Sequence, residues 1–398
     1  MTFGTIRRMQ RETRIAVAAE RSSAYGRNFI RGVAEVAEQH TDWALTLIDP
    51  NSVAGKVADG YDGLICRIAD SRTARVLAAC GKPVVDCLCE HDNPRFATVR
   101  VDAEAIGRLA AEHLLKHQFV NIAFCGYRHV VFSNRRRNAF AAFLEKNGIR
   151  PAIYRPPLRK QNRFGKDFLL GDRVESPPDS ADLANWMKRL PKPVGVFCCD
   201  DLRASQVLAV CRMLKLAVPD DVAILGVDDD PIYCMFSTPR LSSIDPDATE
   251  IGRAAANTLA MMLNNRKAAA NPPSMTIQPR GIVERASTNT YPSAPPWFTD
   301  AIAFIHANAA KGISAADVFR HVGFSRTLVE RTFRTRFSST VQGLIAATRM
   351  ETARRLLSAT SLPIKEIAAL SGFSTLEYFS RTFTAATGQP PSDWRKSR

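Results

Sequence analysis

The sequence lacks several features that would assign it to a familiar class of protein. No apolar run reaches the roughly 18–20 residues that a membrane-spanning helix needs, and the N-terminus is polar and basic, unlike a secretory signal. The nine cysteines are scattered without repeated C-x-x-C pairs, and no His/Cys cluster completes a metal site around Cys87 and Cys89. We therefore predict a cytoplasmic protein with no membrane contact, no metal and no cofactor.

The sequence also lacks the motifs of common enzymes. It contains no G-x-S-x-G nucleophile elbow and no phosphate-binding P-loop. An α/β enzyme that acts on a carbohydrate stays open as an alternative, with Asp200 and Asp228 as a conceivable pair of catalytic carboxylates. Catalysis would not explain the C-terminal segment described below, so we predict that the chain is not an enzyme.

Positive charge is plentiful and unevenly distributed. The formal net charge is +15. From Trp297 onward there are 14 Lys/Arg against 7 Asp/Glu, which makes the density of net charge there more than twice that of the preceding residues. A basic segment of this kind favours a polyanionic partner, although a solvated basic face would give the same count.

Short apolar strands alternate with amphipathic helices over residues 14–285. Strands are predicted at 14–19, 45–48, 62–66, 83–85, 98–101, 121–126, 153–154, 194–198, 223–227 and 274–283. Such alternation predicts parallel sheets covered by helices on both faces. About ten strands are too many for one small sheet, so we expect an α/β fold of two doubly wound lobes facing a cleft, preceded by a tail at 1–13.

Polar residues follow the predicted strands, at the end of the sheet where ligands bind in open α/β folds. These residues are Tyr25, Asp86, Asp102, Arg135, Arg136, Arg137, Asp200, Asp201 and Asp228. Carboxylates accept sugar hydroxyls and arginine offers a fork of donors, so the set predicts a site for a polyhydroxylated ligand. Each aspartate has a second interpretation as a helix N-cap, and the arginines as a solvated helix start.

Residues 14–285 resemble the sugar-binding domain of the LacI/GalR repressors, which is related to periplasmic binding proteins. The resemblance rests on V-D-A-E-A-I-G-R-L-A-A-E-H-L-L-K-H-Q-F-V-N-I-A-F-C-G at 101–126 and on L-S-S-I-D-P-D at 241–247. It also rests on Arg137–Phe140, Asp200-Asp201 and Gly226–Asp229. The resemblance implies that Asp102 is a cleft residue, that Arg137 binds ligand and that Asp228 accepts ligand hydroxyls.

Two departures from that family stand out. Gln118 occupies a position where the family usually has glycine. The chain also begins almost at the first predicted strand, without the family's N-terminal helix-turn-helix, so DNA binding must come from elsewhere in the chain.

The last hundred residues contain the same short sequence motif twice. G-F-S triplets begin at Gly323 and Gly372, an offset of 49, and R-T-F triplets begin at Arg331 and Arg381, an offset of 50. Each copy follows an apolar helical pattern and predicts a helix, a turn at glycine and a second helix. A proline-containing linker at 286–298 separates this all-α domain with two helix-turn-helix units, at 299–398, from the two lobes.

The C-terminal domain resembles the AraC/XylS family of transcription regulators. The segment A-R-R-L-L-x-x-T-x-L-P-I-x-E-I-A-x-x-S-G-F-S-x-x-x-Y-F-S-R-T-F-x-x-x-x-G-x-x-P-x-x-W-R at 353–395 is similar to that family's signature. In each unit the second helix is the expected reader of the major groove. The candidate DNA-binding residues are Ser325, Arg326, Thr327, Glu330, Arg331 and Arg334 in the first unit, and Ser374, Thr375, Leu376, Glu377, Ser380 and Arg381 in the second.

The two modules together resemble the regulators of xylose operons. This resemblance implies a homodimer that binds double-stranded DNA at promoter direct repeats and responds to a monosaccharide, D-xylose being the first choice. Activation, with RNA polymerase as a partner, is the favoured direction of control. A DNA-binding regulator whose sensor has lost its ligand remains an alternative.

Overall fold

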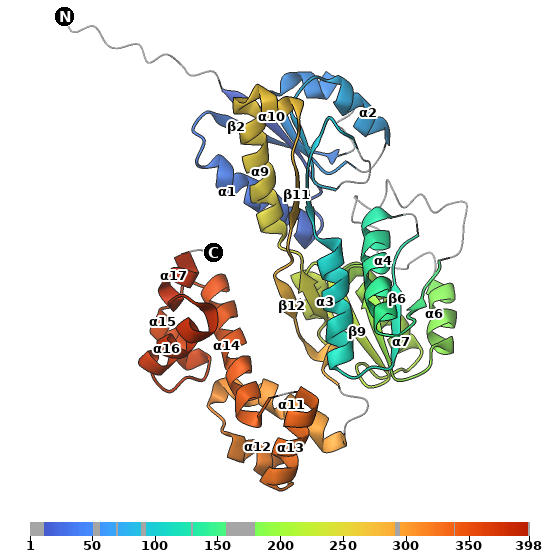
Figure 1. Cartoon of the computed structure of the whole chain (residues 1–398), viewed down its shortest axis with the longest axis vertical. Coiled ribbons are helices and arrows are strands. Elements are labelled where there is room, and N and C mark those ends of the chain that lie inside the picture. The colour runs from blue at the N-terminus through green and yellow to red at the C-terminus, as the bar shows by residue number, and fades with distance from the viewer. Residues whose placement is uncertain are drawn as a thin grey trace, which may run out of the picture. The chain divides into compact units, whose positions relative to one another are not determined.

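The computed structural model describes residues 12–50, 56–68, 71–88, 93–128, 130–156, 180–290, 295–337 and 339–396. The chain divides into two compact units, Met1–Thr288 and Asn289–Arg398. The first unit consists of two α/β lobes and the second is all helical (Figure 1). This architecture confirms the predicted fold class.

Lobe 1 is built on a sheet of parallel strands in the order β11-β5-β4-β3-β1-β2. Its strands are β1 (Thr13–Ala18), β2 (Trp43–Ile48), β3 (Gly63–Cys66), β4 (Val84–Asp86), β5 (Ala97–Val101) and β11 (Ser274–Ile277). Its helices are α1 (Ala24–Ala37), α2 (Ser71–Ala79), α9 (Ala248–Asn264) and α10 (Arg266–Ala270). Because strand side chains alternate, Ile15 joins the core beneath α1 and α9 while Ala16 joins the opposite core with α2.

Lobe 2 repeats this plan with strands in the order β12-β10-β9-β8-β6-β7, of which β12 alone is antiparallel to its neighbour. Its strands are β6 (Asn121–Cys125), β7 (Ala152–Ile153), β8 (Val194–Cys198), β9 (Val222–Val227), β10 (Ser242–Asp245) and β12 (Gly281–Val283). Its helices are α3 (Ala103–Lys116), α4 (Val131–Lys146), α6 (Ser180–Arg189), α7 (Asp201–Met213) and α8 (Pro231–Phe236).

The chain crosses between the lobes three times, at β5 to α3, at β10 to α9 and at β11 to β12. The single strand predicted at 274–283 is therefore wrong, because residues 278–280 carry the chain from one sheet to the other. Gln118, the residue that replaces a family glycine, has a φ of 63°. That left-handed conformation explains the family's preference for glycine there.

The second unit contains helices arranged as two similar halves joined by α14 (Figure 1). They are α11 (Pro296–Asn308), α12 (Ala315–Val322), α13 (Arg326–Phe337), α14 (Val341–Ala359), α15 (Ile364–Leu370), α16 (Leu376–Thr387) and α17 (Pro391–Lys396). The helix-turn-helix pairs are α12 with α13 and α15 with α16. Each half has its own core, around Phe298 and Phe333 in the first and around Phe379 and Phe383 in the second.

Glycine makes each of the two turns. Gly323 and Gly372 have φ values of 72° and 81°, in the left-handed region that L-amino acids with a side chain rarely adopt. The phenylalanine that follows each glycine differs between the copies, since Phe324 is 42% exposed and Phe373 is 7% exposed. Among the described helices, none is long and apolar enough to cross a membrane.

Candidate functional site

A cavity of about 140 Å³ lies where the carboxyl ends of the strands of both lobes meet. It is lined by Glu20, Ser22, Ser23, Tyr25, Arg67, Cys87, Leu88, Arg100 and Val101 of lobe 1 and by Ala103, Phe132, Arg135, Arg136, Asp200, Asp201, Leu202, Asp228, Asp230 and Tyr233 of lobe 2. Sites for drug-sized ligands usually measure about 300–1,000 Å³, so this cavity favours a small ligand.

Four of the seven predicted ligand-binding residues line the cavity, namely Tyr25, Asp200, Asp201 and Asp228. Asp228 follows β9 directly and keeps 22% of its side chain exposed. Burial raises the pKa of its carboxyl to about 7, although the Arg136 guanidinium, 3.7 Å away, favours the charged form. The φ of Asp228 is 110°, a strained conformation of a kind that clusters at functional sites.

Arg135 and Arg136 line the cavity, whereas the predicted Arg137 does not. Arg136 is 3% exposed, donates to the carbonyl oxygen of Cys199 and stacks over Phe132, whereas Arg137 lies outside the lining and bonds to Asn138. Successive helical residues point about 100° apart, so three consecutive arginines cannot all face the ligand. The family spacing R-x-x-A-F, measured back from Ala139, also selects position 136.

Asp86 and Asp102 lie outside the lining of this cavity. The buried Asp86 carboxylate accepts hydrogen bonds from the backbone N–H groups of Ile68 and Leu88, so it holds two loops in place. Asp102 caps α3 by accepting from the N–H of Ala105 at 2.9 Å. Its other carboxylate oxygen accepts from the side-chain amide of Gln278 at 2.7 Å, so Asp102 is both an N-cap and a partner of Gln278.

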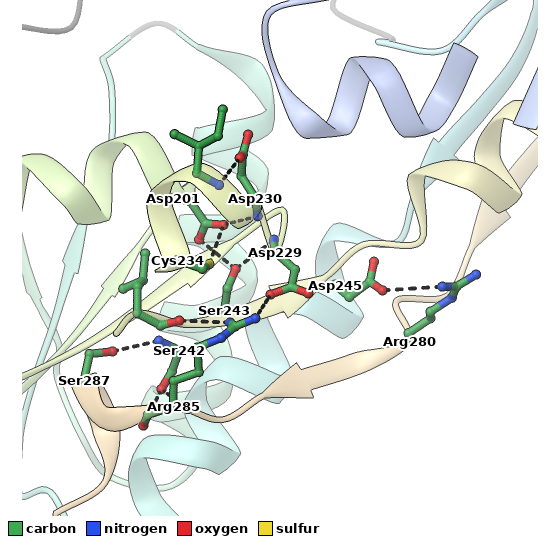
Figure 2. Close-up of polar contacts among 12 residues, drawn as sticks. Asp201, Asp229, Asp230, Cys234, Ser242, Ser243, Asp245, Arg280, Arg285 and Ser287 are labelled. Atoms are coloured by element: carbon green, nitrogen blue, oxygen red, sulfur yellow. Dashed lines mark hydrogen bonds and ion pairs between the residues drawn. The ribbon is translucent and has the colours of Figure 1, made fainter. Parts of the chain in front are cut away.

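Asp200 and Asp201 touch the cavity but are held by the protein itself. Asp200 accepts from the N–H of Arg203 at 2.6 Å and caps α7. Asp201 accepts from the N–H of Asp230 at 2.8 Å and from the hydroxyl of Ser243 at 2.6 Å (Figure 2). Burial, with a smaller contribution from Asp228, raises the pKa of Asp201 well above its usual range.

Salt bridges surround this network at the edge of lobe 2. Arg285 contacts the Asp229 carboxylate at 2.7 Å, and Arg280 lies 3.7 Å from Asp245 (Figure 2). These pairs fix the loop after β9 against β10 and β12. Asp201 and its neighbours therefore form a rigid support, which leaves Asp228 as the lobe 2 carboxylate best placed to meet a ligand.

The pairing of Glu20 with Arg67 was not among the predictions. The two side chains form a buried ion pair, and the Arg67 guanidinium lies 4.6 Å from the centre of the Tyr25 ring. Burial lowers the pKa of Arg67 to about 10, so it stays charged at neutral pH. Arg67 comes one residue after β3, so the strand-end pattern could have found it; Phe132 and Tyr233, inside helices, carry no such signal.

One hydrogen bond joins the lobes beside the cavity. The carboxylate of Asp230, in lobe 2, accepts from the N–H of Ala24 at the start of α1 in lobe 1, at 2.8 Å. Its other oxygen accepts from the N–H of Ile232, in the first turn of α8. Because this bond spans the cavity's rim, the lobes cannot separate there without breaking it.

The predicted DNA-binding residues lie on or just before the second helix of each pair. Ser325, Arg326, Thr327, Arg331 and Arg334 are exposed and Glu330 is half-buried. In the second copy, Ser374, Thr375, Leu376, Glu377 and Arg381 are exposed and Ser380 is half-buried. The cap of the second helix in this copy, α16, is Thr375, whose hydroxyl accepts from Tyr378 N–H at 3.1 Å.

Two further arginines of the second unit, Arg349 and Arg395, form hydrogen bonds within that unit. Arg349 of α14 donates to the carbonyl oxygens of Ala309 and Ile313, at 2.9 and 2.7 Å. Arg395 donates to the carbonyl oxygen of Leu362 at 2.6 Å. Arg349 thus fastens α14 to the turns that lead from α11 into the first helix-turn-helix.

Comparison with known proteins supports both modules. Residues 111–288 match the family of periplasmic binding protein-like domains, and residues 318–397 match a helix-turn-helix domain family. The xylose operon regulatory protein of Escherichia coli K12 is 26% identical over 96% of each chain, and that of Haemophilus influenzae is 25% identical over 96% of this chain and 98% of its own. The chain is similar to xylose operon regulators along its whole length.

Solved structures give the same result. The structure of the xylose-binding transcription activator xylR is 26% identical, has a TM-score of 0.61 and is matched over 98% of this chain and 99% of that one. A LacI-family regulator of Enterococcus faecium with bound ribose, 18% identical with a TM-score of 0.56, shares the fold over 71% of this chain. The chain thus combines a periplasmic binding protein-like domain with a helix-turn-helix domain, and it matches xylose operon regulators over nearly its whole length.

Proposed function

We propose that the chain is a sugar-responsive transcription regulator that binds a monosaccharide in the cavity between the lobes. The observation that carries this proposal is the convergence of Asp228, Arg136 and Arg67 with the rings of Tyr25 and Phe132 in one small cavity. Charged groups can hydrogen-bond sugar hydroxyls, while aromatic rings suit the apolar face of a pyranose. D-xylose is the first candidate, because the full-length relatives are named for xylose.

Binding of sugar changes promoter occupancy in this proposal, and the direction of control is activation. The protein acts as a homodimer on promoter direct repeats, contacts RNA polymerase and performs no catalysis. The boundaries of its working domains are 14–285 for the sensor, 286–298 for the linker and 299–398 for DNA binding. Part of the linker, 291–294, lies outside the described residues.

A ligand screen tests the proposal directly. Thermal unfolding is recorded with D-xylose, L-arabinose, D-ribose and common hexoses, and the sugar that stabilises the chain is recovered and checked for chemical change. Stabilisation by an unchanged sugar, with altered binding to promoter DNA, supports the regulator. Consumption of the sugar would instead favour a carbohydrate enzyme, and no stabilisation by any sugar would favour a sensor that has lost its ligand.

Arg136 and Arg137 offer a matched pair of variants for the cavity. We expect Arg136→Ala to weaken sugar binding by roughly 10-fold or more, because a charge-assisted hydrogen bond contributes about 1.5–3 kcal/mol. Arg137→Ala should leave the affinity within about twofold, since its side chain lies outside the lining. Calorimetric titration with the sugar from the screen measures both variants; a larger loss at Arg137 would reverse the assignment.

Arg326 is the residue we expect to read a base pair. It is exposed at the start of α13, and arginine pairs with the O6 and N7 atoms of guanine through two hydrogen bonds. Arg326→Ala should relax sequence preference at one position by about 1–3 kcal/mol. A binding-site selection experiment measures this, with Arg355→Ala on α14 as a control at an exposed arginine; an unchanged sequence profile would contradict the role.

A further inference from the structure

Two histidines and a glutamate form a compact cluster in lobe 2, away from the sugar cavity. His113 lies in the last turn of α3 and His117 caps the C-terminus of that helix, and the centres of their rings are 4.5 Å apart. Glu284 follows β12, and its Oε1 lies 3.2 Å from Nε2 of His117. One donor atom from each of the three residues lies within 4.8 Å of the others.

The surroundings of the cluster are those of a built site. His113 and His117 are 6% and 0% exposed, while the Glu284 side chain is 25% exposed and gives access from solvent. Thr288 places its hydroxyl oxygen 3.0 Å from Nε2 of His113 and 2.8 Å from the hydroxyl of Ser242. The Thr288 hydroxyl, itself held by Ser242, is thus a candidate fourth donor beside His113.

We propose that His113, His117 and Glu284 bind one Zn²⁺ ion, with Thr288 or water completing a tetrahedron. Two imidazole nitrogens and one carboxylate form a familiar zinc ligand set, whereas Mg²⁺ and Ca²⁺ prefer oxygen ligands. Zinc–nitrogen bonds of about 2.0–2.1 Å place tetrahedral ligands about 3.3 Å apart. The 3.2 Å between His117 and Glu284 is close to that separation.

Zinc at this position would connect the sugar cavity to the end of the sensor. Ala103, at the start of α3, lines the cavity, while His113 lies in the last turn of the same helix and His117 caps its C-terminus. Glu284 and Thr288 belong to the final residues of the first unit, which ends at Thr288. The ion would therefore tie a helix that begins at the ligand to the segment that leads toward the DNA-binding unit.

The test uses the full chain, stripped of metal with a chelator and titrated with ZnCl₂ by calorimetry. We expect one Zn²⁺ site per chain. Glu284→Gln keeps the side-chain shape and His117→Gln removes a ligand; each should lower Zn²⁺ affinity at least about 10-fold, since losing even an indirect partner of a metal costs 10- to 100-fold. Thermal unfolding without metal identifies a variant that fails to fold.

His321 provides the matched control, because it pairs with the Asp300 carboxylate at 3.1 Å but has no second histidine beside it in the described chain. His321→Gln should bind Zn²⁺ as the unmodified chain does. Equal Zn²⁺ affinity in Glu284→Gln and the unmodified chain would overturn the proposal, as would the absence of a single tight site. The contact between His117 and Glu284 would then be an ordinary buried hydrogen bond.

Discussion

Asp228→Asn should weaken binding of the effector sugar by roughly 10- to 100-fold, because a neutral amide replaces a charged acceptor whose hydrogen bonds are worth about 1.5–3 kcal/mol each. The variant should nevertheless be more stable than the unmodified chain at pH 8. In the folded chain the pKa of Asp228 is about 7 rather than the ordinary 3.8, since burial disfavours its charge. Ionising it above pH 7 therefore costs folding free energy, and asparagine avoids that cost.

The pH dependence follows from the same shift. Between about pH 4 and pH 7 the folded state retains a proton that the unfolded state has released, so stability of the unmodified chain falls as pH rises through this interval. Asp228→Asn has no carboxyl at this position and so lacks this pH-dependent loss of stability. The amount by which its melting temperature exceeds that of the unmodified chain should grow from pH 4 to pH 7 and then level off. Sugar affinity of the unmodified chain should rise over pH 6 to 8 as the acceptor ionises.

Calorimetry and thermal unfolding across this pH range measure both effects. Asp59→Asn is the control, because Asp59 is exposed and outside the cavity lining. A variant that keeps full sugar affinity would remove Asp228 from the binding site. A variant less stable than the unmodified chain at pH 8 would mean that pairing with Arg136 outweighs the burial of the carboxylate.

Gly372→Ala should destabilise the second helix-turn-helix far more than Gly323→Ala destabilises the first. Both glycines adopt a left-handed backbone conformation, which costs a residue with a side chain about 1–2 kcal/mol. A Cβ at position 372 would also lie 2.5 Å from the carbonyl oxygen of Ala309, whereas one at 323 meets nothing within 4 Å. We expect about 1–2 kcal/mol at 323 and about 2–5 kcal/mol at 372, where overpacking adds to the strain.

Hydrogen exchange of the full chain separates the two effects by location. Gly372→Ala should lose amide protection across α15 and α16 and weaken DNA binding, while Gly323→Ala should show a smaller loss confined to α12 and α13. Similar losses in the two variants would show that the backbone near Ala309 moves aside. The repeated triplet would then tolerate substitution equally in both copies.

Much of the fold follows from local patterns in the sequence. Alternating apolar strands and amphipathic helices predict the two lobes, and the repeated G-F-S motif predicts both helix-turn-helix pairs. Both predictions succeed because the spacing of apolar residues and the residues that form a turn can be read from a short stretch of sequence. The strand at 274–283 is wrong because nothing local marks residues 278–280 as a passage between two sheets. The chain changes lobes there because β11 pairs with β5 at one edge of the lobe 1 sheet and β12 pairs with β10 at one edge of the lobe 2 sheet.

The candidate site could be predicted in part for a similar reason. The strand-end pattern selects Asp228 and Tyr25, but a position after a strand does not distinguish a ligand contact from an N-cap, and Asp102 caps a helix. The side chains of Arg136 and Arg137 point about 100° apart around the helix axis. Which of them faces the cavity depends on how α4 packs against the sheet. Phe132 and Tyr233 reach the cavity only through tertiary structure.

The continuous helix α14 has a consequence for the DNA that this protein would recognise. Its 19 residues, about 28 Å at 1.5 Å per residue, join two helix-turn-helix units of different sequence within one chain. A single chain should therefore need an operator with a direction, unlike the palindromes read by symmetric dimers. Inserting one base pair between its two contact segments would rotate them by about 35°, and reversing the operator would turn the bound protein to face away from the promoter.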